Sequence, residues 1–110
     1  MFLPDCAELV ELYFACWMLD AITVPLNHRY LEREARFALE HSGAVALVTH
    51  PELVDRIDGI AYDEIGISAR FIAGDARDGW RAFASLMSRR GGGAVPAPCR
   101  RARVCRRRAR

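Results

Sequence analysis

The feature that most constrains the fold is a nearly uncharged stretch over residues 12–26, in which Asp20 is the only charged residue. Asp5 followed by Glu8 resembles a capping box and predicts a helix from about residue 5 to residue 19. The later part of this helix is apolar on nearly every face, which predicts that it is buried. Residues 21–26 then form a short β-branched run, typical of a strand buried on both faces and ended by Pro25.

The rest of the pattern continues this alternation of helices and strands. The next expected elements are a helix, a strand, a helix, a strand and a helix, over residues 31–42, 44–48, 49–57, 70–73 and 78–87. Gly43 is a natural stop for the first of these helices, Thr49 with Glu52 predicts the start of the second, and Trp80 opens the apolar stripe of the last. Strands that alternate with helices imply an α/β fold. We expect a partial doubly wound parallel sheet of about three strands with flanking helices.

Charge divides the 110 residues into two parts. Residues 1–90 carry nine Arg and 14 acids, whereas residues 91–110 carry seven Arg, no acid, a Gly91-Gly92-Gly93 run and two prolines. We therefore expect a globular unit over residues 1–90 and a disordered basic tail over residues 91–110. No stretch free of charge is long enough to span a membrane, and the start of the chain lacks the basic and apolar regions of a secretion signal. These features predict a cytoplasmic protein.

No residue pattern in the chain points to a catalytic or metal site. Cys6, Cys16, Cys99 and Cys105 lack the spacing of zinc ligands, and we expect Cys6 and Cys16 to be free thiols buried in the first helix. The three histidines, His28, His41 and His50, are expected to be solvated or capping residues. Trp17 and Trp80 are expected in the core rather than as stacking platforms. We assign no catalytic, cofactor-binding or metal-ligating residue.

One polar turn lies where α/β folds place ligands. Asn27, His28 and Arg29 follow the predicted strand at 21–26. Both a structural role and a ligand-binding role are open for this turn, and the structural role is the simpler interpretation.

Two segments resemble the AMP-forming acyl-CoA synthetase, or adenylate-forming ligase, family. The sequence LPDCAE (residues 3–8) is similar to that family's helix entry, with Asp5 in place of an asparagine. The sequence DAITVPLNHR (residues 20–29) resembles a family stretch that begins with glycine, a residue that tolerates positive φ. Asp20 tolerates positive φ better than most residues would. The match covers about residues 3–57 well and residues 70–87 loosely.

The resemblance implies a reaction, and the departures from the family pattern restrict what this chain can contribute to it. The family uses ATP, Mg²⁺ and CoA to convert a carboxylic acid into an acyl-adenylate and then a thioester. Its phosphate loop is rich in Ser, Thr and Gly and ends in proline-lysine-glycine, and a later lysine stabilises charge on the reacting phosphate. This chain has no lysine, and its Gly91-Gly92-Gly93 run is flanked directly by Arg and Ala rather than by Ser, Thr or Lys. We expect an N-terminal-domain fragment that is inactive alone and holds no cofactor.

The basic tail leaves other interpretations open. An Arg-rich end in a chain rich in Ala and Gly is what out-of-frame reading of GC-rich DNA would produce. Alternatively, the cluster over residues 100–110 binds nucleic acid or another polyanion weakly and without specificity, since no aromatic residue is interleaved for base stacking. A third alternative is an interaction module that pairs with the remaining fragment of a split ligase, or with itself, through an open sheet edge.

Overall fold

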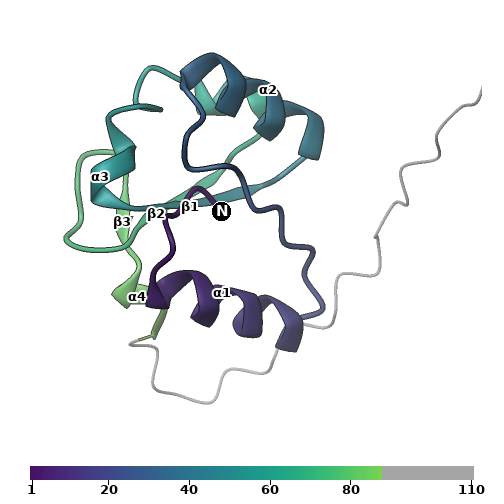
Figure 1. The fold of residues 1–110 in the computed structure, drawn as a ribbon, viewed down its shortest axis with the longest axis vertical. Coiled ribbons are helices and arrows are strands. Elements are labelled where there is room, and N and C mark those ends of the chain that lie inside the picture. The colour runs from purple at the N-terminus through teal and green to yellow at the C-terminus, as the bar shows by residue number, and fades with distance from the viewer. Residues whose placement is uncertain (88–110) are drawn as a thin grey trace, which may run out of the picture.

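A computed structural model describes residues 1–87 of the chain and shows an α/β arrangement (Figure 1). The elements in chain order are four helices, a 3₁₀ helix and three strands: α1 (Ala7–Met18), α2 (Glu32–Ser42), β1 (Ala46–Thr49), α3 (Pro51–Val54), η1 (Tyr62–Ile65), β2 (Ala69–Ile72), β3 (Arg81–Ala82) and α4 (Ala84–Met87). The predicted fold class is therefore confirmed. The basic tail predicted at residues 91–110 lies outside the described residues.

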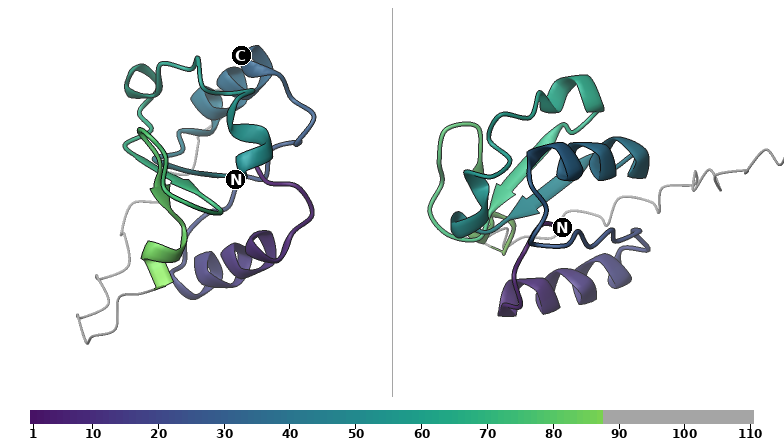
Figure 2. Two further views of the ribbon diagram at one scale, coloured as in Figure 1. Left: turned by 90° about the vertical axis from the view of Figure 1, so that its left-hand side faces the viewer. Right: turned by 45° about the horizontal axis from the view of Figure 1, so that its top comes forward.

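The three strands form one parallel sheet in the order β1-β2-β3. Ala46 lies opposite Ala69 in the first pair, and Phe71 lies opposite Arg81 in the second. In Figures 1 and 2, α1 and α2 lie on opposite faces of this sheet. The molecule is thus a small layered unit with helices on both faces of a parallel sheet.

Alternating strand residues divide the interior into two clusters. Leu47 and Ile72 pack in the larger cluster, which includes Ala35 and Leu39 of α2 and the buried residues between β1 and β2. Val48 and Phe71 pack in the smaller one with Leu12 of α1. Successive side chains of a strand point to opposite faces, so each strand supplies both clusters.

The strand predicted at residues 21–26 is not formed. The place beside β1 is taken instead by Phe2, which forms an isolated parallel bridge to Thr49 and donates its backbone N–H to the Val48 carbonyl at 2.8 Å. The 21–26 segment is one step farther out: the Met1 ammonium donates to the Val24 carbonyl at 2.7 Å, and the Leu26 N–H donates to the Met1 carbonyl at 2.8 Å. Pro25 has no N–H with which to extend a ladder.

Helix α1 has the predicted extent, but its end is exposed and its cap differs. Cys6 is the N-cap and makes no side-chain capping bond, so the Asp5 capping box does not form. Trp17 is 78% exposed and Met18 86%, because the sheet covers only the side of α1 that carries Leu12. The prediction that this part of the helix is buried is wrong, and so is the placement of Trp17 in the core.

The cap predicted for the helix after β1 also differs. The N-cap of α3 is His50, whose Nδ1 accepts the Glu52 backbone N–H at 3.3 Å, while Thr49 is the last residue of β1. Thr49 is fully buried, and its hydroxyl has no hydrogen-bond partner among residues 1–87.

The helix predicted at residues 78–87 is shortened to its last turn. Gly79 adopts a φ of 75°, Trp80 and Arg77 exchange backbone hydrogen bonds of 2.8 and 3.0 Å, and Arg81–Ala82 then joins the sheet as β3. Trp80 is nevertheless in the core, 3% exposed. The apolar spacing correctly predicted that Trp80 and Phe83 are buried, but it wrongly predicted a helix over most of this segment.

Candidate functional site

The polar turn that follows the 21–26 segment is held by its own hydrogen bonds. The Asn27 side chain accepts the Arg29 backbone N–H at 3.0 Å, and the Asn27 carbonyl accepts the Tyr30 N–H at 3.0 Å. The His28 carbonyl accepts a bond from Arg56 at 3.2 Å. This is an Asx-type turn, in which a side chain replaces a backbone partner. Its geometry agrees with the structural role considered from the sequence.

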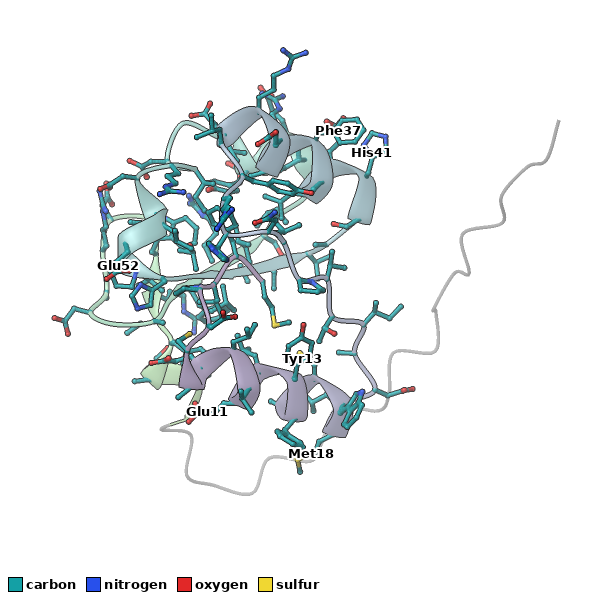
Figure 3. All side chains as sticks on the ribbon, in the orientation of Figure 1. Glu11, Tyr13, Met18, Phe37, His41 and Glu52 are labelled. Atoms are coloured by element: carbon teal, nitrogen blue, oxygen red, sulfur yellow. The ribbon has the colours of Figure 1, made fainter. Side chains whose placement is uncertain are left out.

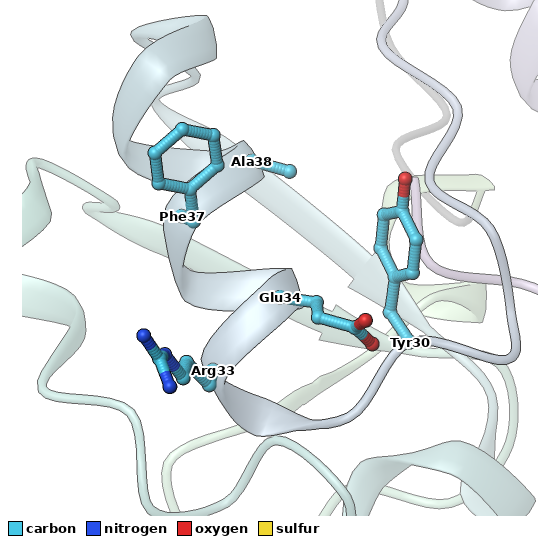
Figure 4. A pocket seen from close by; sticks show the side chains of 5 residues that line it. All are labelled: Tyr30, Arg33, Glu34, Phe37 and Ala38. Atoms are coloured by element: carbon cyan, nitrogen blue, oxygen red, sulfur yellow. The ribbon is translucent and has the colours of Figure 1, made fainter.

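A groove of about 580 Å³ runs beside this turn along α2 (Figure 4). It is lined by Tyr30, Arg33, Glu34, Phe37 and Ala38. Figure 4 shows the Glu34 carboxylate reaching toward Tyr30, and that carboxylate accepts the Leu31 N–H at 3.1 Å. Glu34 therefore supplies a hydrogen-bond acceptor for the backbone N–H at the start of α2. Arg33 is the other charged residue that lines the groove.

The three histidines lie on separate elements and do not form a common site. His28 is in the polar turn, His41 stacks on Phe37 of α2 with a centroid separation of 4.0 Å, and His50 caps α3. Figure 3 shows Phe37 and His41 side by side at the outer end of α2. Within residues 1–87 there is no group of three His, Cys, Asp or Glu residues that could hold a metal ion.

The two cysteines of the described range are free and half-buried. Desolvation raises the pKa of the Cys6 thiol, which disfavours the reactive thiolate. Cys99 and Cys105 lie outside the described residues, as do the Gly91-Gly92-Gly93 run and the Arg cluster. No helix of residues 1–87 has the length and apolar character needed to cross a membrane.

Arg70 lies against two aromatic rings in the larger core. Its guanidinium carbon is 4.9 Å from the centre of the Tyr62 ring and 5.7 Å from that of Trp80, and the two rings meet edge to face at 5.6 Å. The Tyr62 hydroxyl donates to the Ile57 carbonyl at 2.6 Å, and burial raises the pKa of this phenol well above its usual range. A phenol held in this way is a structural group rather than an acid–base catalyst.

Comparison with known protein families identifies the family of this chain. A family model described as AMP-binding enzyme matches residues 1–85. The chain belongs to the AMP-binding enzyme family. The match includes every element from α1 to β3. No curated protein and no solved structure gives a match.

Within this AMP-binding enzyme segment, sequence reasoning missed the outward face of α1. Val10, Phe14 and Trp17 recur at i, i+4 and i+7, and all three are exposed. A hollow of about 370 Å³ lies on the same face, lined by Val10, Tyr13, Phe14, Trp17 and Thr23. The signal was present in the sequence, since a helix that is apolar all round needs a partner on each side.

Proposed function

We propose that residues 1–87 are a structural part of an AMP-forming acid–thiol ligase, and that the chain does not by itself activate an acid. The observation that carries this proposal is the family match over residues 1–85, combined with a chain that contains no lysine. The acyl-CoA synthetase branch of the family is the part of the proposal that rests on the resemblance of residues 20–29.

The described residues support a scaffolding role. The Asn27 side chain makes a local hydrogen bond within the polar turn, and the His28 carbonyl accepts one from the distant Arg56. Glu34 accepts the Leu31 N–H at the start of α2, and the Tyr62 phenol donates to the Ile57 carbonyl. The hydrogen bonds of these groups stabilise the backbone, and we assign none of the groups a role in binding or converting a substrate. We assign no Mg²⁺ ligand among residues 1–87.

The missing charge explains why activity is not expected from this chain alone. Transfer of an adenylyl group develops negative charge on phosphate oxygens, and fixed donors and cations aimed at that charge are usually the largest catalytic contribution. The chain supplies neither a lysine nor a loop rich in Ser, Thr and Gly. ATP, Mg²⁺ and CoA therefore belong, in this proposal, to the complete family reaction rather than to these residues.

A chimera tests the scaffolding role directly. Residues 1–85 would replace the corresponding segment of an active ligase of the family, and ATP–pyrophosphate exchange would be measured with that ligase's own acid. We expect the chimera to retain exchange with an unchanged KM for ATP. The purified 110-residue chain, assayed beside it, should show no exchange above background.

A paired variant separates loss of folding from loss of chemistry. The chimera carrying Leu47→Asp, a change in the middle of β1, should be insoluble or inactive because a buried charge disrupts the core. The chimera carrying Arg33→Gln should be as active as its parent. Exchange by the 110-residue chain alone, or a soluble chimera whose KM for ATP is altered by Arg33→Gln, would contradict the proposal.

A further inference from the structure

The first two residues form a short extended segment that is hydrogen-bonded on both sides, and Figure 1 shows it beside β1. On the β1 side, the Phe2 N–H donates to the Val48 carbonyl at 2.8 Å. On the other side, the Met1 amine donates to the Val24 carbonyl at 2.7 Å, and the Met1 carbonyl accepts the Leu26 N–H at 2.8 Å. This alternation is that of a middle strand in a parallel ladder. The Met1 amine therefore lies where a backbone amide N–H belongs.

The edge of β1 that faces this middle strand carries a backbone N–H without an acceptor. The Thr49 carbonyl accepts the Ala73 N–H at 2.8 Å on the β2 edge, whereas the Val48 carbonyl accepts the Phe2 N–H on the opposite edge. Because the N–H and C=O of one strand residue point to the same edge, the Val48 N–H also points toward the middle strand. Val48 is buried, and its N–H has no hydrogen-bond acceptor within residues 1–87. A buried N–H in this position favours the addition of a carbonyl group.

A carbonyl bonded directly to the Met1 nitrogen would face this N–H. Phe2 faces β1 and Met1 faces residues 21–26, so the next group toward the N-terminal side faces β1 again. In the register set by the Phe2–Val48 bond, the carbonyl of that group is the acceptor for the Val48 N–H. An acyl group on the Met1 amine supplies such a carbonyl, and the amide N–H that remains keeps the bond to the Val24 carbonyl.

We propose that the Met1 α-amine is a modification site that takes a short acyl group, whose carbonyl accepts the Val48 N–H and continues the strand. The donor is an acyl thioester. The amine nitrogen bonds to the acyl carbon, the carbon–sulfur bond breaks, and the amine proton leaves with the sulfur as a free thiol. Burial lowers the pKa of this amine from 8.0 to about 6, so the amine is neutral and nucleophilic at neutral pH. This assignment does not depend on the proposed function.

Acetylation of the full chain tests the proposal, because a chain without lysine has no amine besides that of Met1 to form a stable acetamide. Urea unfolding is compared at about pH 9, where the free amine is neutral in both the folded and the unfolded chain. We expect acetylation to lower the unfolding equilibrium constant about 5-fold, the effect of one added hydrogen bond. The N-ethyl chain is the matched control, because an ethyl group has the carbon skeleton of an acetyl group but no carbonyl. It should be no more stable than the free amine.

Hydrogen exchange of the Val48 amide supplies a second readout that a general change in stability would not imitate. The Ala73 amide is the internal reference, because it is bonded to the Thr49 carbonyl on the other edge of β1. Acetylation should slow exchange at Val48 at least ~10-fold relative to exchange at Ala73, and N-ethylation should leave that ratio unchanged. An acetylated chain that is no more stable than the N-ethyl chain, or an exchange ratio that acetylation does not change, would overturn the proposal.

Discussion

At the scale of single residues, Asp20 carries the clearest backbone strain. It is the one non-glycine residue of 1–87 with positive φ, at 53°. Sequence reasoning placed it where the resembled family has glycine, and the observed φ explains that preference. We predict that Asp20→Gly raises the free energy of unfolding by roughly 0.5–1 kcal/mol, and that Asp20→Ala lowers it by about 1 kcal/mol, since alanine lacks the polar side chain that eases this conformation. Urea denaturation measures both changes.

Gly43 provides the control for this prediction. It ends α2 with a φ of 63°, and a Cβ added there would meet no atom within 4 Å. Gly43→Ala should therefore cost about 1 kcal/mol through backbone strain alone. If Asp20→Gly were neutral while Gly43→Ala was destabilising, strain at Asp20 would be excluded as the reason for the family preference.

At the scale of elements, the sequence predicted α1, α2, β1 and β2 to within a few residues, because each has a clear apolar period or a strong stop such as Gly43. It failed where an alternative partner decided the outcome. Residues 21–26 have strand composition, yet Phe2 holds the place beside β1. No local pattern reveals which of two apolar segments will reach a sheet edge. No catalytic or binding residue was predicted from the sequence, and the outer face of α1 was wrongly predicted to be part of the core.

Both tryptophans were expected in the core, but Trp17 on α1 is exposed and Trp80 between β2 and β3 is buried. Substituting each one tests this difference in burial. Trp80 is buried against Tyr62 and Arg70, so Trp80→Ala should lower the free energy of unfolding by about 3–5 kcal/mol. Trp17→Ala, at a residue that is 78% exposed, should change it by less than about 0.5 kcal/mol. Thermal melts followed by far-UV circular dichroism measure both, and similar losses in the two variants would contradict the burial found here.

At the scale of the whole molecule, the N-terminus joins three parts of the fold. Met1 bonds through its ammonium to Val24 and through its carbonyl to Leu26, and Phe2 bridges to Thr49 of β1. Burial lowers the pKa of the Met1 amine from 8.0 to about 6, an effect that the neighbouring Cys16 thiol partly opposes. The folded chain therefore favours the neutral amine, whereas the unfolded chain remains protonated up to a higher pH.

This difference predicts how global stability depends on pH. Between the two pKa values the unfolded state binds more protons, so stability rises with pH. The contribution is complete above about pH 8 and is lost as the pH falls through about 6, a total of roughly 2–3 kcal/mol for a shift of this size. Urea unfolding at a series of pH values measures this contribution.

The N-terminally acetylated chain is the control, because it has no amine to titrate and reports the contribution of all other groups. The difference between the two curves should rise between pH 6 and pH 8, and parallel curves would show that the amine is as well solvated in the folded chain as in the unfolded one.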